Sequence, residues 1–136
     1  MIRSGFAIMM AASLMACGSS GAENTTEVAR ARSGNVDVIL LAEQPALNRG
    51  MAAFTIEFHE ASEAAPLVDA GAVKASAVMP MAGMAPMMAS VDVAPTATAG
   101  RYAASTELTM VGEWRIAVEW DGPAGRGAAT LLPKVQ

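Results

Sequence analysis

The chain has 136 residues, of which 53% are hydrophobic and only 4% are aromatic. Its 13 acidic and 9 basic residues give a formal net charge of -4. Because the charge is negative, the composition excludes a protein that seeks nucleic acid, or an anionic membrane, by electrostatic attraction.

The first residues have the features of an export signal. Arg3 supplies a positive charge, and an apolar run from Phe6 to Ala12 follows, too short to cross a membrane as a helix. The tripeptide Leu-Met-Ala before Cys17 resembles the lipobox of bacterial lipoproteins, where the cysteine becomes the first residue and carries lipid. We predict a lipoprotein signal peptide at residues 1–16 and lipidation of Cys17. An ordinary signal peptide that leaves a free thiol is the alternative.

The single cysteine limits how the rest of the chain is stabilised. With Cys17 acylated, neither a disulfide nor a cysteine zinc site is available, so stability must come from burial. We expect the protein at the periplasmic face of the cell envelope, bound to the membrane through this lipid. Gly18 and Ser19 follow the cysteine with no aspartate, which favours the outer membrane.

The sequence divides into a tether and one domain. Residues 17–34 hold the lipidated cysteine and a stretch of small, polar and charged residues with no apolar period, which predicts a flexible tether. Residues 35–136 are enough for one compact domain and hardly for two.

Short alternating apolar runs separated by Gly, Pro, Asn and Asp predict an all-β domain of about seven strands, folded as two packed antiparallel sheets. The two clearest runs span 51–59 and 113–120. They place Phe54, Ile56 and Phe58, and then Trp114, Ile116, Val118 and Trp120, on buried faces. The weaker runs are 36–41, 73–79, 87–93, 101–108 and 127–132. A helix over residues 60–75 is the alternative, although Pro66 and Gly71 interrupt it.

Two aromatic residues have predicted structural roles. Trp114 is expected to pack one sheet against the other. Tyr102 follows Gly100 at a strand start, and we expect it to hydrogen-bond across a corner of the sandwich.

Half of the ten residues in MPMAGMAPMM, from Met79 to Met88, are methionine. A thioether is uncharged and soft, so it suits Cu(I) and not Zn(II), Ca(II) or Mg(II). The loop can fold the sulfurs of Met79, Met81 and Met84 around one ion. Further candidate ligands are Met87, Met88, Met110 and His59. Two other interpretations remain: a hydrophobic plug in the core, and an adaptable apolar surface that receives a partner.

Other chemistry has little support in the sequence. His59 is the only histidine, and it is expected on a strand surface, with a role as fourth ligand beside the methionines as the alternative. Glu57, Glu60 and Glu63 are predicted to be a solvated edge. No Gly-x-Ser-x-Gly turn and no phosphate-binding glycine loop occur, so we predict that the protein is not an enzyme.

The segment from Met79 to Trp120 resembles the YtkA-like domain, which is related to the FixH family of small extracytoplasmic immunoglobulin-like β-sandwiches. The matching features, in order, are Met79, Pro80, Met81, Gly83 and Met84, then Gly100 and Tyr102, then Met110, Gly112 and Trp114, preceded by an opening strand after Asn48. The family often places a histidine in or after the methionine run, and this chain has none there.

The resemblance implies copper handling: buffering, delivery to an oxidase, or transfer to an efflux system. It also implies partners among envelope copper proteins or oxidase-assembly proteins. We therefore expect a lipid-anchored envelope protein that binds Cu(I). The alternative is an interaction module that binds no metal and docks on a membrane complex.

Overall fold

The computed structural model describes residues 25–136, which form ten β-strands and no helix. The strands are β1 (Thr26–Ser33), β2 (Val36–Ala42), β3 (Gly50–Glu60), β4 (Ala72–Met79), β5 (Met87–Pro95), β6 (Arg101–Leu108), β7 (Gly112–Glu113), β8 (Arg115–Gly122), β9 (Gly125–Leu131) and β10 (Lys134–Val135). All seven predicted strands are present, which confirms the all-β prediction and excludes the alternative helix. In this part of the chain no helix is long and apolar enough to span a membrane. The predicted signal peptide and Cys17 lie outside the described residues.

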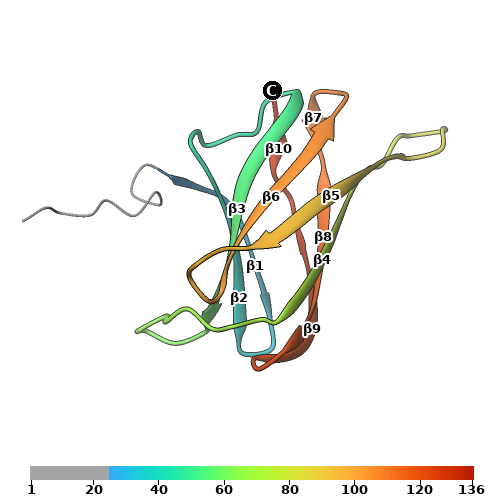
Figure 1. Ribbon diagram of the computed structural model, residues 1–136. Helices are drawn as coiled ribbons and strands as arrows, with labels where there is room; N and C mark the ends of the chain where they lie inside the picture. Colours follow the sequence, from blue (N-terminus) through green and yellow to red (C-terminus); the bar gives the residue numbers. More distant parts are fainter. Residues whose placement is uncertain (1–24) are drawn as a thin grey trace, which may run out of the picture.

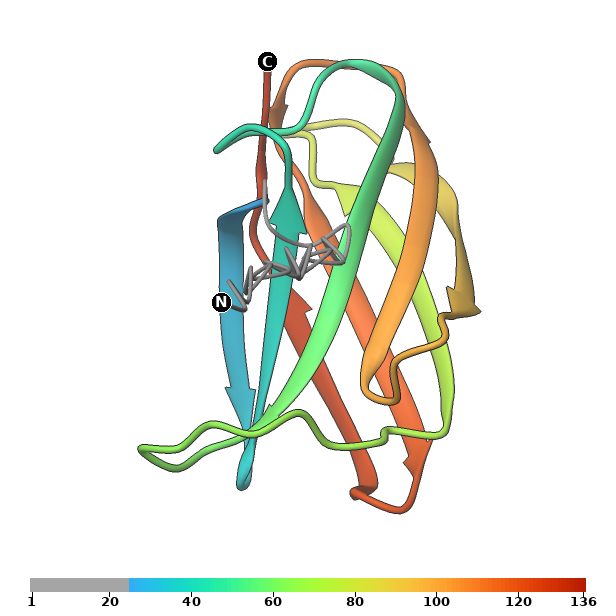
Figure 2. The same ribbon diagram turned by 60° about the vertical axis from the view of Figure 1, so that its left-hand side comes forward.

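The strands form an antiparallel sandwich. Eight of them are hydrogen-bonded in the order β1-β2-β3-β6-β5-β4-β8-β9, and β10 and β7 form a separate pair. Although β1 and β9 end this order, they lie beside each other, so the sheet folds back on itself around one core (Figure 2). Figure 1 shows that the connection from β4 to β5 projects at one end of the sandwich and the connection from β3 to β4 at the other.

Alternation along β3 and β8 builds the core. Phe54, Ile56 and Phe58 are buried, and so are Ile116, Val118 and Trp120 on the facing strand. The ring of Phe58 meets that of Trp120 edge-on at 5.2 Å between centroids. Full burial of one such side chain contributes about 1.5–3 kcal/mol to stability.

Trp114 and Tyr102 are both buried, and the hydrogen bond predicted for Tyr102 is confirmed. Trp114 is fully buried, and its Nε1 donates a hydrogen bond to the carbonyl of Met110 at 3.0 Å. The hydroxyl of Tyr102 donates to the carbonyl of Gly71 at 2.9 Å, which fastens the start of β6 to the loop before β4. Burial raises the pKa of this hydroxyl above its ordinary value.

The prediction of a tether over residues 17–34 is wrong at its C-terminal end. Residues 26–33 form β1 and pair along β2, with Ser33 opposite Val36. Arg32 forms two hydrogen bonds, of 2.6 and 2.9 Å, to the buried carboxylate of Asp37. Polar side chains hid this strand in the sequence because it is an edge strand that buries little of its own surface. The first described strand therefore begins about nine residues before the predicted start of the domain.

Candidate functional site

The methionine-rich segment forms the end of the β4–β5 hairpin. Pro80 and Pro86 flank its loop, and because proline lacks an N–H, neither can extend the ladder. Gly83 adopts a positive φ of 72°, which a turn requires and which glycine tolerates. The amide of Met84 donates to the carbonyl of Met81 at 3.4 Å. The loop is therefore a defined turn that carries Met81 and Met84 beyond the sandwich.

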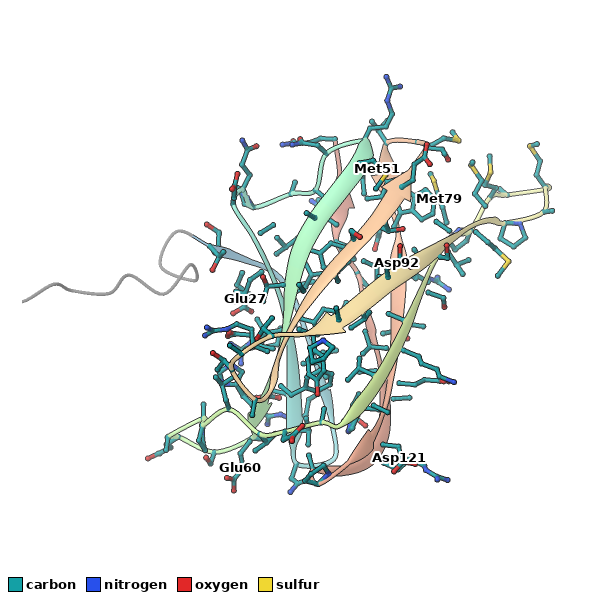
Figure 3. The ribbon with its side chains drawn as sticks, viewed as in Figure 1. Glu27, Met51, Glu60, Met79, Asp92 and Asp121 are labelled. Carbon is teal, nitrogen blue, oxygen red and sulfur yellow. The ribbon has the colours of Figure 1, made fainter. Side chains whose placement is uncertain are left out.

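Met79 and Met87 are directly opposite each other across this hairpin. Side chains at such positions share one face, with Cβ atoms about 5 Å apart. Both methionines are partly buried and pack against the hydrophobic core. The two methionine side chains therefore leave the backbone next to each other at the base of the hairpin, where Figure 3 labels Met79.

A third segment, residues 109–112, borders this pair. The hydroxyl of Thr109 donates to Sδ of Met87 at 3.9 Å. A Cβ built at Gly112 would lie 2.7 Å from Cε of Met79, so that methyl group occupies the space a side chain would need. Met110 lies between these two contact positions, and its side chain is 38% exposed. We call Met79, Met87 and Met110 the methionine cluster.

The other methionines lie around the cluster at the same end of the molecule. Met84 and Met88 are 69% and 75% exposed. Met88 pairs with Val78, and since successive strand residues point to opposite faces, it points away from the face of Met87. Sequence reasoning missed Met51, which Figure 3 shows at the same end as Met79. Only the pairing of β3 with β6 brings it there, and no local pattern signals that pairing.

His59 does not join the methionines, so the alternative role as a fourth ligand beside them is wrong. It lies at the end of β3 that pairs with the start of β6, whereas the cluster lies beyond the end of β6. Both ring nitrogens are also bonded: Nδ1 to the carbonyl of Ala65 at 2.6 Å, and Nε2 to Oε1 of Glu57 at 3.1 Å.

The prediction that Glu57 belongs to a solvated edge is also wrong, because this residue is buried. Its carboxylate accepts a hydrogen bond from Nε of Arg101 at 2.9 Å, in addition to its contact with His59. The predicted edge is exposed only at Glu60 and Glu63. These buried acid–base contacts connect neighbouring strands and have a structural role. Among residues 25–136, no three His, Cys, Asp or Glu side chains are grouped so that they could hold a metal ion.

Comparison with known proteins bears on the whole domain. The model of the YtkA-like family matches residues 30–119, a span that runs from β1 to β8 and includes the methionine hairpin. Searches of curated proteins and of solved structures found no match. The match covers well over half of the chain, which therefore belongs to the YtkA-like family.

Proposed function

We propose that this protein binds Cu(I) at the methionine cluster and handles copper in the cell envelope, as a buffer or a donor. One observation carries the proposal: Met79 and Met87 oppose each other on one face, with the segment that holds Met110 in contact with both. The proposed role is binding and transfer of an ion, with no catalytic step.

The chemistry of the donors fits this ion. Thioethers are neutral, so they can be half-buried at little desolvation cost, and they favour Cu(I) over Zn(II), Ca(II) and Mg(II). The three donors of the cluster come from β4, β5 and the segment after β6, which limits their freedom before an ion arrives. Met81, two residues after Met79 and partly buried, is a further potential donor.

The cellular setting belongs to the same proposal. A lipid on Cys17 would hold the domain at the periplasmic face of a membrane, the outer membrane being favoured. There it would exchange copper with envelope copper proteins or oxidase-assembly proteins. An oxidising envelope disfavours thiolate ligands, and methionine provides sulfur that does not form disulfides.

The test is an anaerobic Cu(I) titration of residues 18–136 against a competing chelator. We expect the parent to bind one ion, and a Met79→Leu, Met87→Leu variant to lose that binding, because leucine keeps the apolar volume and removes the sulfur. A Met84→Leu, Met88→Leu variant is the matched control, and it should bind as the parent does.

Each contrary result has a defined meaning. Loss of binding in the control alone would move the site to the exposed loop. A parent that never competes with the chelator would refute copper binding altogether.

The second candidate function is an interaction module that binds no metal and docks on a membrane complex. The exposure of Met84 and Met88 favours it, since flexible apolar side chains adapt to a partner surface. Leucine substitutions at the cluster separate the two functions: they remove copper binding and leave docking largely intact.

A further inference from the structure

Large exposed hydrophobic side chains gather at one end of the sandwich. Among residues 25–136 they are Met51, Met84, Met88, Met110, Val111 and Leu132. The topology explains their meeting, because the start of β3, the end of β6, the end of β9 and the β4–β5 hairpin all lie at this end. We call it the apolar end.

The opposite end has a different surface. Figure 3 shows Glu60 and Asp121 there, far from Met51 and Met79. Its turns expose polar and charged side chains such as Asn35, and none of the large exposed hydrophobic residues of the described chain lies there. Along the direction of the strands, the molecule therefore has one end with an apolar surface and one with a polar surface.

The apolar end exposes charged side chains of both signs. Its exposed charged residues are Glu43, Glu107 and Glu113, and Arg49, Arg115 and Lys134. These three acidic and three basic side chains balance one another, although the whole chain is acidic.

The chain enters the fold near the apolar end. Thr26 pairs with Ala42, which leads into the loop before β3, whereas Ser33 lies toward the opposite end. The register places Leu41 opposite Thr55, so Thr26 lies roughly four residues, or about 13 Å, from the start of β3. Seven residues separate Cys17 from Thr25, and the eight Cα–Cα steps between them can span at most about 28 Å. A fully extended stretch of this length would be long enough to place Cys17 beyond the start of β3, on the side of the apolar end.

We propose that the apolar end rests on the lipid bilayer that holds Cys17, so that the methionine cluster faces the membrane. The inference rests on the proposed lipid anchor and is independent of metal binding. Apolar side chains leave water when they enter the headgroup region, and the anchor supplies the second contact that stable membrane attachment needs. A sulfur site in this position would meet the periplasmic face of an integral membrane protein.

The test uses the processed, lipidated protein in vesicles of phosphatidylethanolamine and phosphatidylglycerol. With Cys17 acylated, a single new cysteine can carry a spin label: Val111→Cys or Leu132→Cys at the apolar end, and Asn35→Cys or Glu63→Cys at the other. We expect molecular oxygen to relax the first two labels more than a water-soluble nickel chelate does. The order should reverse for the other two. Equal exposure to the chelate at both ends would overturn the proposal.

Two controls separate the remaining outcomes. A Cys17→Ser protein should lose its vesicle attachment; if it stays bound, the anchor is wrong whatever the labels report. The same protein without lipid should be monomeric, and the spin labels that replace Val111 and Leu132 should be accessible to the nickel chelate. Shielding of these labels with sedimentation as a dimer would show that the apolar end receives a second copy and would refute a bilayer contact. Cu(I) titration of the labelled proteins reports the metal site separately.

Discussion

Two buried carboxylates show how this small domain tolerates charge in its sheet. Asp37 on β2 and Glu57 on β3 are both buried, and each accepts hydrogen bonds from an arginine on the next strand: Arg32 on β1 for Asp37, and Arg101 on β6 for Glu57. A buried charge is tolerated only when its hydrogen bonds are satisfied. Among the described residues no buried side-chain nitrogen or oxygen lacks a partner.

Asp37→Asn should make the protein less stable at neutral pH and no less stable in acid. Hydrogen bonding to Arg32 holds the pKa of the Asp37 carboxyl below its ordinary value of 3.8. A carboxyl group whose pKa is lower in the folded than in the unfolded state stabilises the fold at pH values above its unfolded pKa. This contribution is lost as the pH falls through the folded pKa. Since Arg32 is mostly exposed, we expect a loss of about 1–2 kcal/mol at pH 7.

The measurement for Asp37→Asn is urea unfolding of parent and variant at pH 7 and again below pH 3. The difference in unfolding free energy should shrink in acid. A difference that stays constant across this range would mean that the ionised carboxylate contributes nothing.

At the scale of elements, the β5–β6 turn is fastened to the loop before β4. Gly100 has a φ of 85°, and a Cβ there would lie 2.6 Å from the carbonyl oxygen of Val68. The carbonyl of Gly100 also accepts the amide of Phe58 at 2.9 Å. With the hydroxyl of Tyr102 on Gly71, these contacts close the polar end of the sandwich.

Gly100→Ala should therefore destabilise the fold by about 2–4 kcal/mol, from backbone strain and a steric clash together. Gly34→Ala is the matched control, because Gly34 has a φ of 59° but no atom within 4 Å of an added Cβ. It should lose only the strain component, about 1 kcal/mol. Chemical unfolding of both variants measures the difference. Equal losses would show that the contact with Val68 has no energetic importance.

The strands could be predicted from the sequence wherever one face is apolar, as in β3 and β8. The strand β1 could not be predicted in this way, because most of its side chains are polar or small. Only its pairing with β2 shows that it is a strand. Glu57 was predicted as a solvated residue because its partner Arg101 is 44 positions away. The methionine run indicated the candidate site as Met79, Met81 and Met84. Only the strand register shows that Met79 lies opposite Met87.

At the scale of the whole molecule, the two ends of the sandwich differ in composition. The polar end, opposite the apolar end, holds the buried carboxylate of Glu57 near the turn that the hydroxyl of Tyr102 fastens. The other end gathers methionines from strands far apart in the sequence. Because the cluster combines residues of the β4–β5 hairpin with the segment before β7, an ion bound there would cross-link that hairpin to this segment.

Cu(I) should accordingly stabilise the folded protein as a whole. A ligand at 100 times its Kd adds about 2.7 kcal/mol to the unfolding free energy, if it binds only the native state. For a domain of this size that corresponds to a rise in Tm on the order of 10 °C. Thermal unfolding under anaerobic conditions, with and without Cu(I), measures the shift.

Two controls test whether the rise in Tm comes from Cu(I) bound at the methionine cluster. Zn(II) at the same concentration should leave Tm unchanged, because zinc finds no suitable donors among thioethers. The Met79→Leu, Met87→Leu variant without metal should unfold near the parent, because the substitution conserves apolar volume, and it should gain nothing from Cu(I). If Cu(I) raised Tm equally in the variant, the ion would be binding elsewhere, and the cluster would be a packing feature of the apolar end.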